Sequence, residues 1–187
     1  MVFSVVSRRL LARALAIGGY VLAVEWVRAV VMRAPGTVAP ALMLGGAALA
    51  VAAWGWSPER LGLGRKRLAL RVLGGFALGA VLLLPAAVRS GAAPMLPAGL
   101  ALAAVGISIG EEVAFRGALY AALDDAGGAP LAIGGTTVLW TLAHALSHPP
   151  EFLGAVFAAG LLLAVWRWAC QDLVGPIIGH VIADLAL

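Results

Sequence analysis

Residues 100–123 read LALAAVGISIGEEVAFRGALYAAL. Apart from three charged side chains, this stretch consists mainly of Ala, Leu, Val, Ile and Gly, which is typical of a membrane-spanning helix. A charged side chain at the centre of a bilayer costs about 2.5–3.5 kcal/mol on insertion scales, so such residues usually face the interior of a protein. We therefore expect Glu111, Glu112 and Arg116 to lie inside a helical bundle.

The spacing of these three residues predicts two different roles for the two carboxylates. Glu112 and Arg116 are four residues apart on a helix and share a face, so they can form an ion pair. Glu111 is turned by about 100° from Glu112 and is therefore expected to lack that partner and to be free for chemistry. A purely structural buried ion pair is the alternative, but it leaves the second carboxylate unexplained.

The composition indicates an all-α, polytopic transmembrane helical bundle. The chain has 187 residues, of which 63% are hydrophobic and 12% charged, and its mean hydropathy is +1.01. The apolar runs are long and continuous, unlike the short alternating strands of a transmembrane β-barrel. Basic residues give a net charge of +4 but lie beside apolar runs, which fits cytoplasmic loops and anionic lipids better than nucleic acid. Cys170 is the single cysteine, so an intrachain disulfide is excluded.

The apolar runs predict about seven spans, separated by charged or Pro- and Gly-rich segments. Their approximate ranges are 10–32, 38–56, 68–88, 98–123, 130–146, 152–168 and 173–187. The first run follows several arginines and lacks a small-residue cleavage site, so we expect a retained span and not a signal peptide. The positive-inside rule predicts a cytoplasmic N-terminus and 59–71 loop, and hence an external C-terminus. We interpret residues 1–187 as one membrane domain. The sequence is rich in Ala, Gly and Arg, and we expect the protein to lie in a bacterial plasma membrane.

Polar residues interrupt two later spans as well. His144 lies near the end of the fifth, and His180 and Asp184 lie four residues apart on one face of the last. A lone intramembrane histidine is often a helix–helix hydrogen bond, but polar residues in three spans favour a shared site. Glutamate is a good general base for water, and imidazole can share the proton, hold a metal or stabilise an oxyanion. The set therefore indicates hydrolysis, with Asp184 orienting His180 and Ser108 expected to bond to its own helix.

Four motifs in this order resemble the CPBP family of intramembrane proteases. They are Glu111-Glu112-xxx-Arg116, Trp140-xxx-His144, Phe157-xx-Gly160 and His180-xxx-Asp184. The family comprises CAAX proteases and bacteriocin-processing (Abi) proteins, and its type case is the eukaryotic prenyl-protein CAAX endopeptidase. The resemblance implies a catalytic core at 98–187 and an intramembrane endopeptidase of glutamate or metalloprotease type. The first three spans are similar only in being membrane helices.

The resemblance also implies a role for each motif residue. Glu111 and His144 would activate the attacking water, and His180 and Asp184 would stabilise the oxyanion. Glu112 would assist, and Arg116 would hold the carboxylates in place. This chain departs from the family pattern in having Trp140 where Phe is usual and Asp184 where Asn is common. An ionised carboxylate cannot donate to an oxyanion, so Asp184 is expected to act by orienting His180.

Metal dependence is left open by the residues. Glu111, His144 and His180 form a two-histidine, one-carboxylate set that would suit catalytic zinc with an open position. The same residues suit a metal-free glutamate mechanism, and the soluble His-Glu-x-x-His pattern is absent. We favour the absence of tightly bound zinc. His148 precedes Pro149 and Pro150, so we expect an interfacial loop residue and not a ligand.

Two functions from other classes remain as alternatives. One is a non-catalytic immunity or regulatory protein of the same fold. The intact Glu-Glu, His and His set argues against it, because a scaffold has no need of these residues. The other is a small proton-coupled transporter, for which we would expect internal repeats and discontinuous helices in both halves of the chain. We expect intramembrane polar sites only in the C-terminal half. The expected partners are the lipid bilayer and a membrane-associated peptide or protein substrate, with no role for nucleic acid.

Overall fold

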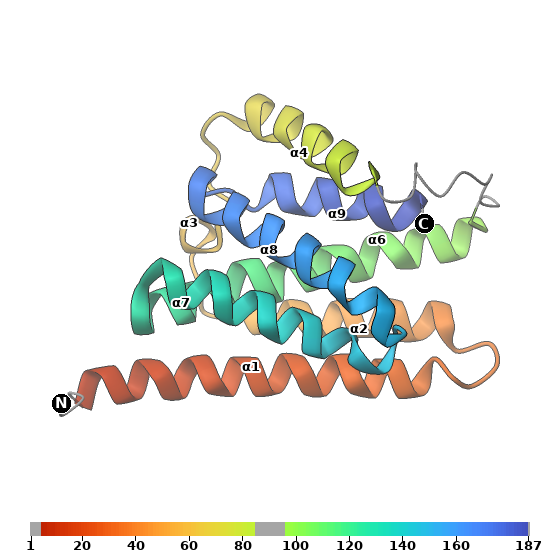
Figure 1. Cartoon of the computed structure of the whole chain (residues 1–187), viewed down its shortest axis with the longest axis horizontal. Helices are drawn as coiled ribbons and strands as arrows, with labels where there is room; N and C mark the ends of the chain where they lie inside the picture. The colour runs from red at the N-terminus through yellow and green to blue at the C-terminus, as the bar shows by residue number, and fades with distance from the viewer. Residues whose placement is uncertain (1–4, 85–95, 187) are drawn as a thin grey trace.

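The computed structural model describes residues 5–84 and 96–186, with side chains from residue 8, and within these ranges the chain is helical and contains no strand. The longer helices are α1 (Val5–Val31), α2 (Val38–Ala50), α4 (Leu68–Leu82), α6 (Ala98–Glu112), α7 (Tyr120–Ala143), α8 (Leu153–Cys170) and α9 (Val174–Ala186). Shorter turns of helix are η1 (Val51–Ala53), α3 (Pro58–Leu61), η2 (Val113–Leu119), η3 (His144–Leu146) and η4 (Pro150–Phe152). Figure 1 shows them as a bundle of roughly parallel and antiparallel helices.

The all-α membrane bundle predicted from the apolar runs is confirmed. Three helical stretches in the described ranges are long and apolar enough to cross a membrane, namely Arg8–Val31, Ala98–Leu146 and Pro150–Cys170. Three shorter apolar helices, Val38–Ala53, Leu68–Leu82 and Val174–Ala186, accompany them. The predicted end of the third span, near residue 88, lies outside the described residues. The length and apolar composition of these helices thus indicate an integral membrane protein.

The long stretch Ala98–Leu146 is two antiparallel legs joined by a sharp turn. Gly128 has φ = 76°, in the left-handed region that favours glycine, and the helical path breaks there. Pro130 follows in the first turn of the second leg, where a backbone N–H is not needed. The turn lies where the sequence predicts the end of the fourth span, and it brings the second leg back alongside the first.

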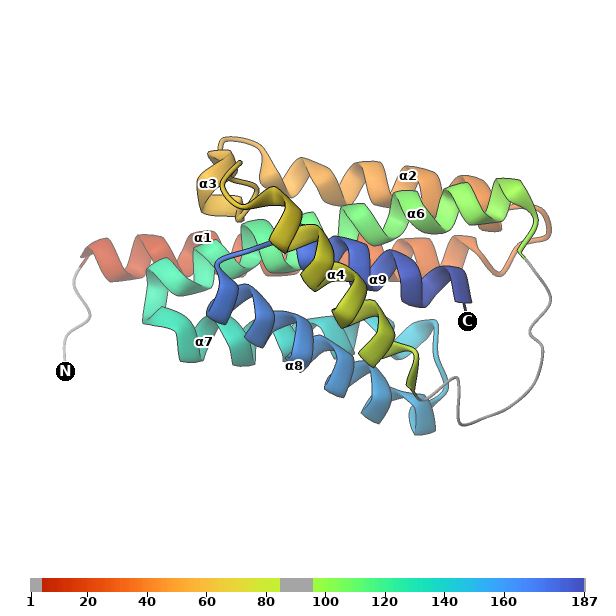
Figure 2. The same cartoon turned by 90° about the horizontal axis from the view of Figure 1, so that it is seen from above.

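Helix α6 occupies the middle of the bundle. It packs against α2 and α9, while α7 packs against α1 and α8, and α4 covers α9. Figures 1 and 2 show α1 and α4 on opposite sides of the bundle, with the N-terminus at one end and the C-terminus at the other. The carboxylate-bearing end of α6 is therefore surrounded by helices from both halves of the chain.

The close approach of α2 to α6 depends on glycine. A Cβ atom on Gly110 would lie 2.3 Å from the carbonyl oxygen of Gly46, and one on Gly46 would lie 2.4 Å from that of Gly106. Small residues allow helix backbones to approach closely inside membranes, where such packing drives helix association. The glycine directly before the paired glutamates thus fixes the position of α6 against α2.

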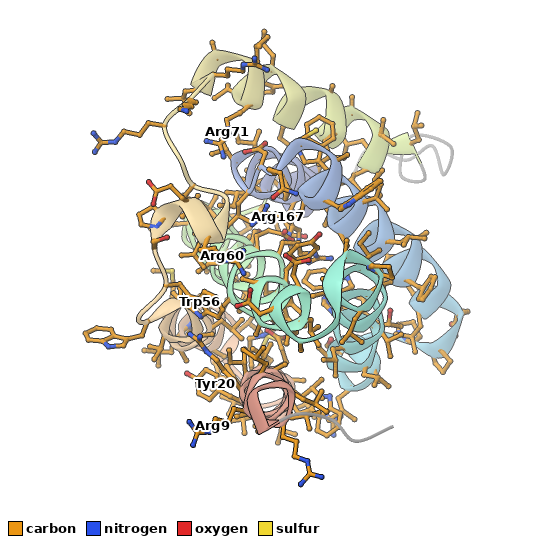
Figure 3. All side chains as sticks on the ribbon, turned by 90° about the vertical axis from the view of Figure 1, so that its left-hand side faces the viewer. Arg9, Tyr20, Trp56, Arg60, Arg71 and Arg167 are labelled. Atoms are coloured by element: carbon orange, nitrogen blue, oxygen red, sulfur yellow. The ribbon has the colours of Figure 1, made fainter. Side chains whose placement is uncertain are left out.

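The end of the bundle that carries the N-terminus is held together by arginines (Figure 3). Asp172 is buried, accepts a 2.6 Å hydrogen bond from Arg71 Nε, and caps the first backbone N–H groups of α9. Arg167 of α8 donates to the backbone carbonyls of Arg116 at 3.1 Å and Arg60 at 2.8 Å. These bonds tie α9 and η2, which both carry candidate site residues, to the same end of the bundle.

Candidate active site

The predicted ion pair between Glu112 and Arg116 is confirmed. Arg116 Nη1 donates to Glu112 Oε1 at 2.9 Å, and both side chains are 0% exposed. The pair lies where the α-helix of α6 gives way to the π-helical turn η2, a wider winding that is frequent at functional sites. A buried guanidinium therefore neutralises the second carboxylate of the motif.

Two motif residues from other helices enclose Arg116. Its guanidinium carbon lies 4.0 Å from the centroid of the Trp140 ring, and its Nη2 donates to the Gly160 carbonyl at 3.3 Å. A Cβ on Gly160 would lie 2.7 Å from the Trp140 ring, so glycine makes room for the indole. Trp140 thus serves as a packing residue in place of the usual Phe, whereas Phe157 is exposed on the outer side of α8.

Arg116 pairs with Glu112 and not with Glu111, as predicted, but the prediction that Glu111 is free of an arginine is wrong. Arg28 Nη2, from α1, donates to Glu111 Oε1 at 3.1 Å. Arg28 is held in turn by Glu25, whose Oε2 accepts from Arg28 Nε at 3.2 Å and also from Nη2. All three side chains are buried, so the buried polar residues are not confined to the C-terminal half of the chain. The expectation failed because the partner comes from a different helix.

His180 contacts both glutamates from α9. Its Nδ1 lies 3.0 Å from Glu112 Oε1, and its Nε2 lies 3.8 Å from Glu111 Oε2 and 3.4 Å from Asp184 Oδ2. The Ser108 hydroxyl lies 2.7 Å from Asp184 Oδ2 and 2.7 Å from the carbonyl oxygen one turn earlier in α6, which is its expected partner. These two acceptors share its single proton. The shared face predicted for His180 and Asp184 therefore turns toward the Glu-Glu motif.

His144 enters the site from the other side, at the start of η3. Its Nδ1 lies 2.8 Å from the Trp140 carbonyl oxygen, which can only accept. The geometry therefore assigns the proton to Nδ1 and leaves Nε2 as a hydrogen-bond acceptor. The His144 and His180 rings both contact the Trp140 indole, at centroid distances of 4.4 and 5.2 Å. One tryptophan thus holds both imidazoles.

A cavity of about 300 Å³ lies between α4, α7, α8 and α9. Its polar lining residues are His144, His148, His180 and Asp184. The rest of its wall is apolar apart from the indole nitrogen, and is formed by Val81, Leu82, Trp140, Phe152, Ala155, Val156, Ala158, Ala159, Leu162, Leu163 and Ala183. Both imidazoles and Asp184 therefore face an apolar chamber, and the two glutamates lie behind His180.

His148 follows η3 in a loop, as expected, but its side chain faces the cavity. Its ring lies 5.1 Å from that of His144 and stacks on Phe152 at 5.3 Å with an interplanar angle of 10°. Burial, and then the positive charge of Arg28, lower the pKa of His148 below its usual value. The sequence did not indicate this position, because the two prolines that follow His148 point to the interface.

The arrangement does not fit a bound zinc ion. Among the described residues, no group of three His, Cys, Asp or Glu side chains is placed to hold one metal together. Glu111, a member of the candidate set with His144 and His180, already accepts from the Arg28 guanidinium. A cationic neighbour at the proposed ligand disfavours a second cation there, so we derive no chemical step through a metal.

The comparison with family models supports the assignment of the chain to a CAAX protease family. Residues 93–186 match the model of the Rce1-like family, type II CAAX prenyl endopeptidase Rce1-like. No curated protein and no solved structure matches the chain. The matched region contains all four motifs and every candidate site residue from Glu111 to Asp184, and it covers half of the chain. The chain therefore belongs to the Rce1-like family of CAAX prenyl endopeptidases.

Proposed function

We propose that this protein is an intramembrane endopeptidase whose substrate is a membrane-associated peptide or protein. Glu111 and His144 activate the water molecule that hydrolyses the peptide bond. The family implies a protease. The observation that carries the proposal is the convergence of His144, His180 and Asp184 on one apolar cavity, with Glu111 directly behind His180. An apolar chamber suits a substrate that arrives from the bilayer.

In this mechanism Glu111 and His144 share the proton taken from water. Glu111 Oε1 is engaged by Arg28, whereas Oε2 faces the site near His180 Nε2. His144 has an acceptor at Nε2, because its Nδ1 is bonded to a carbonyl oxygen. Water that attacks the scissile carbonyl transfers a proton to this pair, and the pair returns it to the departing amine.

His180 would stabilise the negative charge that develops on the substrate carbonyl oxygen. Both ring nitrogens lie near carboxylate oxygens, so the imidazolium form, with two N–H donors, satisfies these contacts. Asp184 accepts from Ser108 and lies beside His180 Nε2, which supports an orienting role for it. Glu112 would fix His180 through Nδ1, and Arg116 would fix Glu112.

We further propose that the arginine-rich end of the bundle faces the cytoplasm of a bacterial cell. Arg8, Arg9, Arg65, Lys66 and Arg67 are exposed in the structure. Positive charges of this kind favour the cytoplasmic side of a membrane. The proposed orientation places the end of α9 that carries Asp184 toward the opposite side.

The test compares the termini of membrane proteins in cells that produce the wild-type chain, Glu111→Gln or Glu151→Gln. Glu151→Gln is a matched control, because it makes the same chemical change at an exposed residue of η4. We expect a small set of new termini with the wild type and the control, and their loss with Glu111→Gln at equal protein level.

The same experiment separates the alternatives. Identical termini in all three strains would favour the non-catalytic regulatory protein. Identical termini together with Glu111-dependent proton movement in vesicles would favour the transporter. Termini that persist in Glu111→Gln would remove Glu111 as the base.

A further inference from the structure

We propose that α1 forms part of the active site, with Arg28 as a positioning residue that holds Glu111 for catalysis and Glu25 as the residue that fixes Arg28. This inference rests on the proposed role of Glu111 as general base. Nothing in the family match points to it, because the match begins at residue 93 and α1 ends at Val31.

The contact that carries the inference joins two helices that are far apart in the sequence. Arg28 Nη2 lies 3.1 Å from Glu111 Oε1, across 83 residues of chain, and both side chains are buried. Glu25 Oε2 holds the guanidinium through Nε at 3.2 Å and through Nη2, so Nη2 is shared between Glu25 and Glu111. Helix α2 leaves room for this arrangement, since a Cβ on Gly45 would lie 2.7 Å from Arg28 Cδ.

The single-oxygen contact leaves Glu111 available for chemistry. Arg28 engages Oε1, whereas Oε2 lies 3.8 Å from His180 Nε2, on the side of the cavity histidines. A bidentate pair would have occupied both oxygens. Arg28 therefore determines which oxygen of Glu111 turns toward the site.

The charges around Glu111 explain why two residues of α1 are needed. A carboxylate buried without a partner takes up a proton and then cannot accept one from water. Arg28 favours the ionised form of Glu111. Glu25 offsets part of the positive charge, so that Glu111 remains basic enough to accept a proton.

Other charged or titratable groups also face Glu111. They are Glu112 and Arg116 from its own segment and His180 and Asp184 from α9. His144 from η3 lines the cavity that His180 also lines. Helix α2 packs against the same segment and has no charged residue. Helix α1 supplies both a positive and a negative charge near Glu111. Neutralising Arg28 and neutralising Glu25 should therefore shift the pH dependence of catalysis in opposite directions.

The experiment measures the pH dependence of kcat/KM for purified protein in detergent. The probe is a peptide that spans the cleavage site found by the comparison of termini. The variants are Arg28→Gln, Arg28→Lys, Glu25→Gln and Glu111→Gln. Arg33→Gln is the matched control, because Arg33 is an exposed arginine just after the same helix.

We expect Arg28→Gln to lower kcat by about 10²-fold with little change in KM, the scale of effect that misplacing a catalytic group produces. The acid limb of its profile should move to higher pH, since the carboxylate loses its stabilising positive charge. Glu25→Gln should move the acid limb to lower pH. Arg28→Lys should recover a measurable part of kcat, and Arg33→Gln should match the wild type.

A stability readout covers the case in which Arg28→Gln folds poorly. Glu111→Gln should restore part of the thermal midpoint lost in Arg28→Gln, because it removes the unpaired buried carboxylate. Absence of this coupling would overturn the inference. So would a folded Arg28→Gln with wild-type kcat and pH profile, or acid limbs that shift in the same direction for Arg28→Gln and Glu25→Gln. Activity in Glu111→Gln would instead refute the proposed function itself.

Discussion

Replacing Arg116 with alanine should destabilise the protein strongly, for a reason visible in the contacts of Arg116. The substitution removes the 2.9 Å ion pair with Glu112, the bond to the Gly160 carbonyl and the contact with the Trp140 ring. Glu112 would then keep only His180 as a hydrogen-bonding partner among the described residues. The variant leaves a carboxylate in a fully buried position without its main counter-charge.

The expected size of the effect follows from that burial. Breaking a buried ion pair by removing one member costs about 3–5 kcal/mol. For a chain of this length each kcal/mol shifts the thermal midpoint by roughly 2–4 °C, so we expect a decrease of about 6–20 °C. Arg65→Ala, at an exposed position, should change the midpoint by much less.

Thermal unfolding of purified protein in one detergent measures both variants against the wild type. Glu112→Gln combined with Arg116→Gln provides a further comparison, because it removes both charges and should be less destabilised than Arg116→Gln alone. The reasoning is refuted if Arg116→Ala unfolds within a few degrees of Arg65→Ala. It is also refuted if the decrease in thermal midpoint of the neutral double variant equals the sum of the decreases for Glu112→Gln and Arg116→Gln alone.

Four further outcomes follow from the site and the bundle. His144→Ala and His180→Ala should each lower kcat/KM by about 10²–10⁴-fold, and the double variant should lose little more, because residues that act as a unit are non-additive. Asp184→Asn should stay within about 10-fold of wild type in kcat/KM, since the amide keeps an acceptor for Ser108 and adds a donor; a complete loss would contradict the orienting role. A reporter after Lys66 should be cytoplasmic and one after Pro94, outside the described residues, external; reversed results at both would overturn the orientation. Activity should survive stringent chelation with metal content below about one-tenth of an equivalent, and a loss restored by zinc would refute the metal-free mechanism.

Local periodicity was sufficient to predict the contacts made within one helix. Glu112 and Arg116 are four residues apart and pair as expected, and His180 and Asp184 share a face for the same reason. The break at Gly127–Gly128 lies between the predicted spans 98–123 and 130–146, in one of the charged and Gly-rich segments that separate the spans. These features depend on the geometry of a single helix or turn, which can be predicted from residue spacing in the sequence.

Contacts between helices were predicted less well. The enclosure of Arg116 by Trp140 and Gly160 needs two further helices at a defined distance, and the sequence does not state that distance. The same holds for His148, whose ring faces the cavity although its neighbours in the sequence indicate a loop. Packing of helices, and not their periodicity, decides which side chains meet.

The partner of Glu111 shows how charge balance could have supplied what periodicity did not. The span 98–123 carries two carboxylates and one guanidinium, so one buried negative charge is left without compensation inside the helix itself. A buried charge needs a counter-charge, and Arg28 is an arginine within an apolar first span that otherwise has no reason to hold one. Glu25, three residues earlier, then explains how Arg28 itself is tolerated. The surplus charge on one helix thus points to the helix that must face it, which is the reason for assigning α1 to the active site.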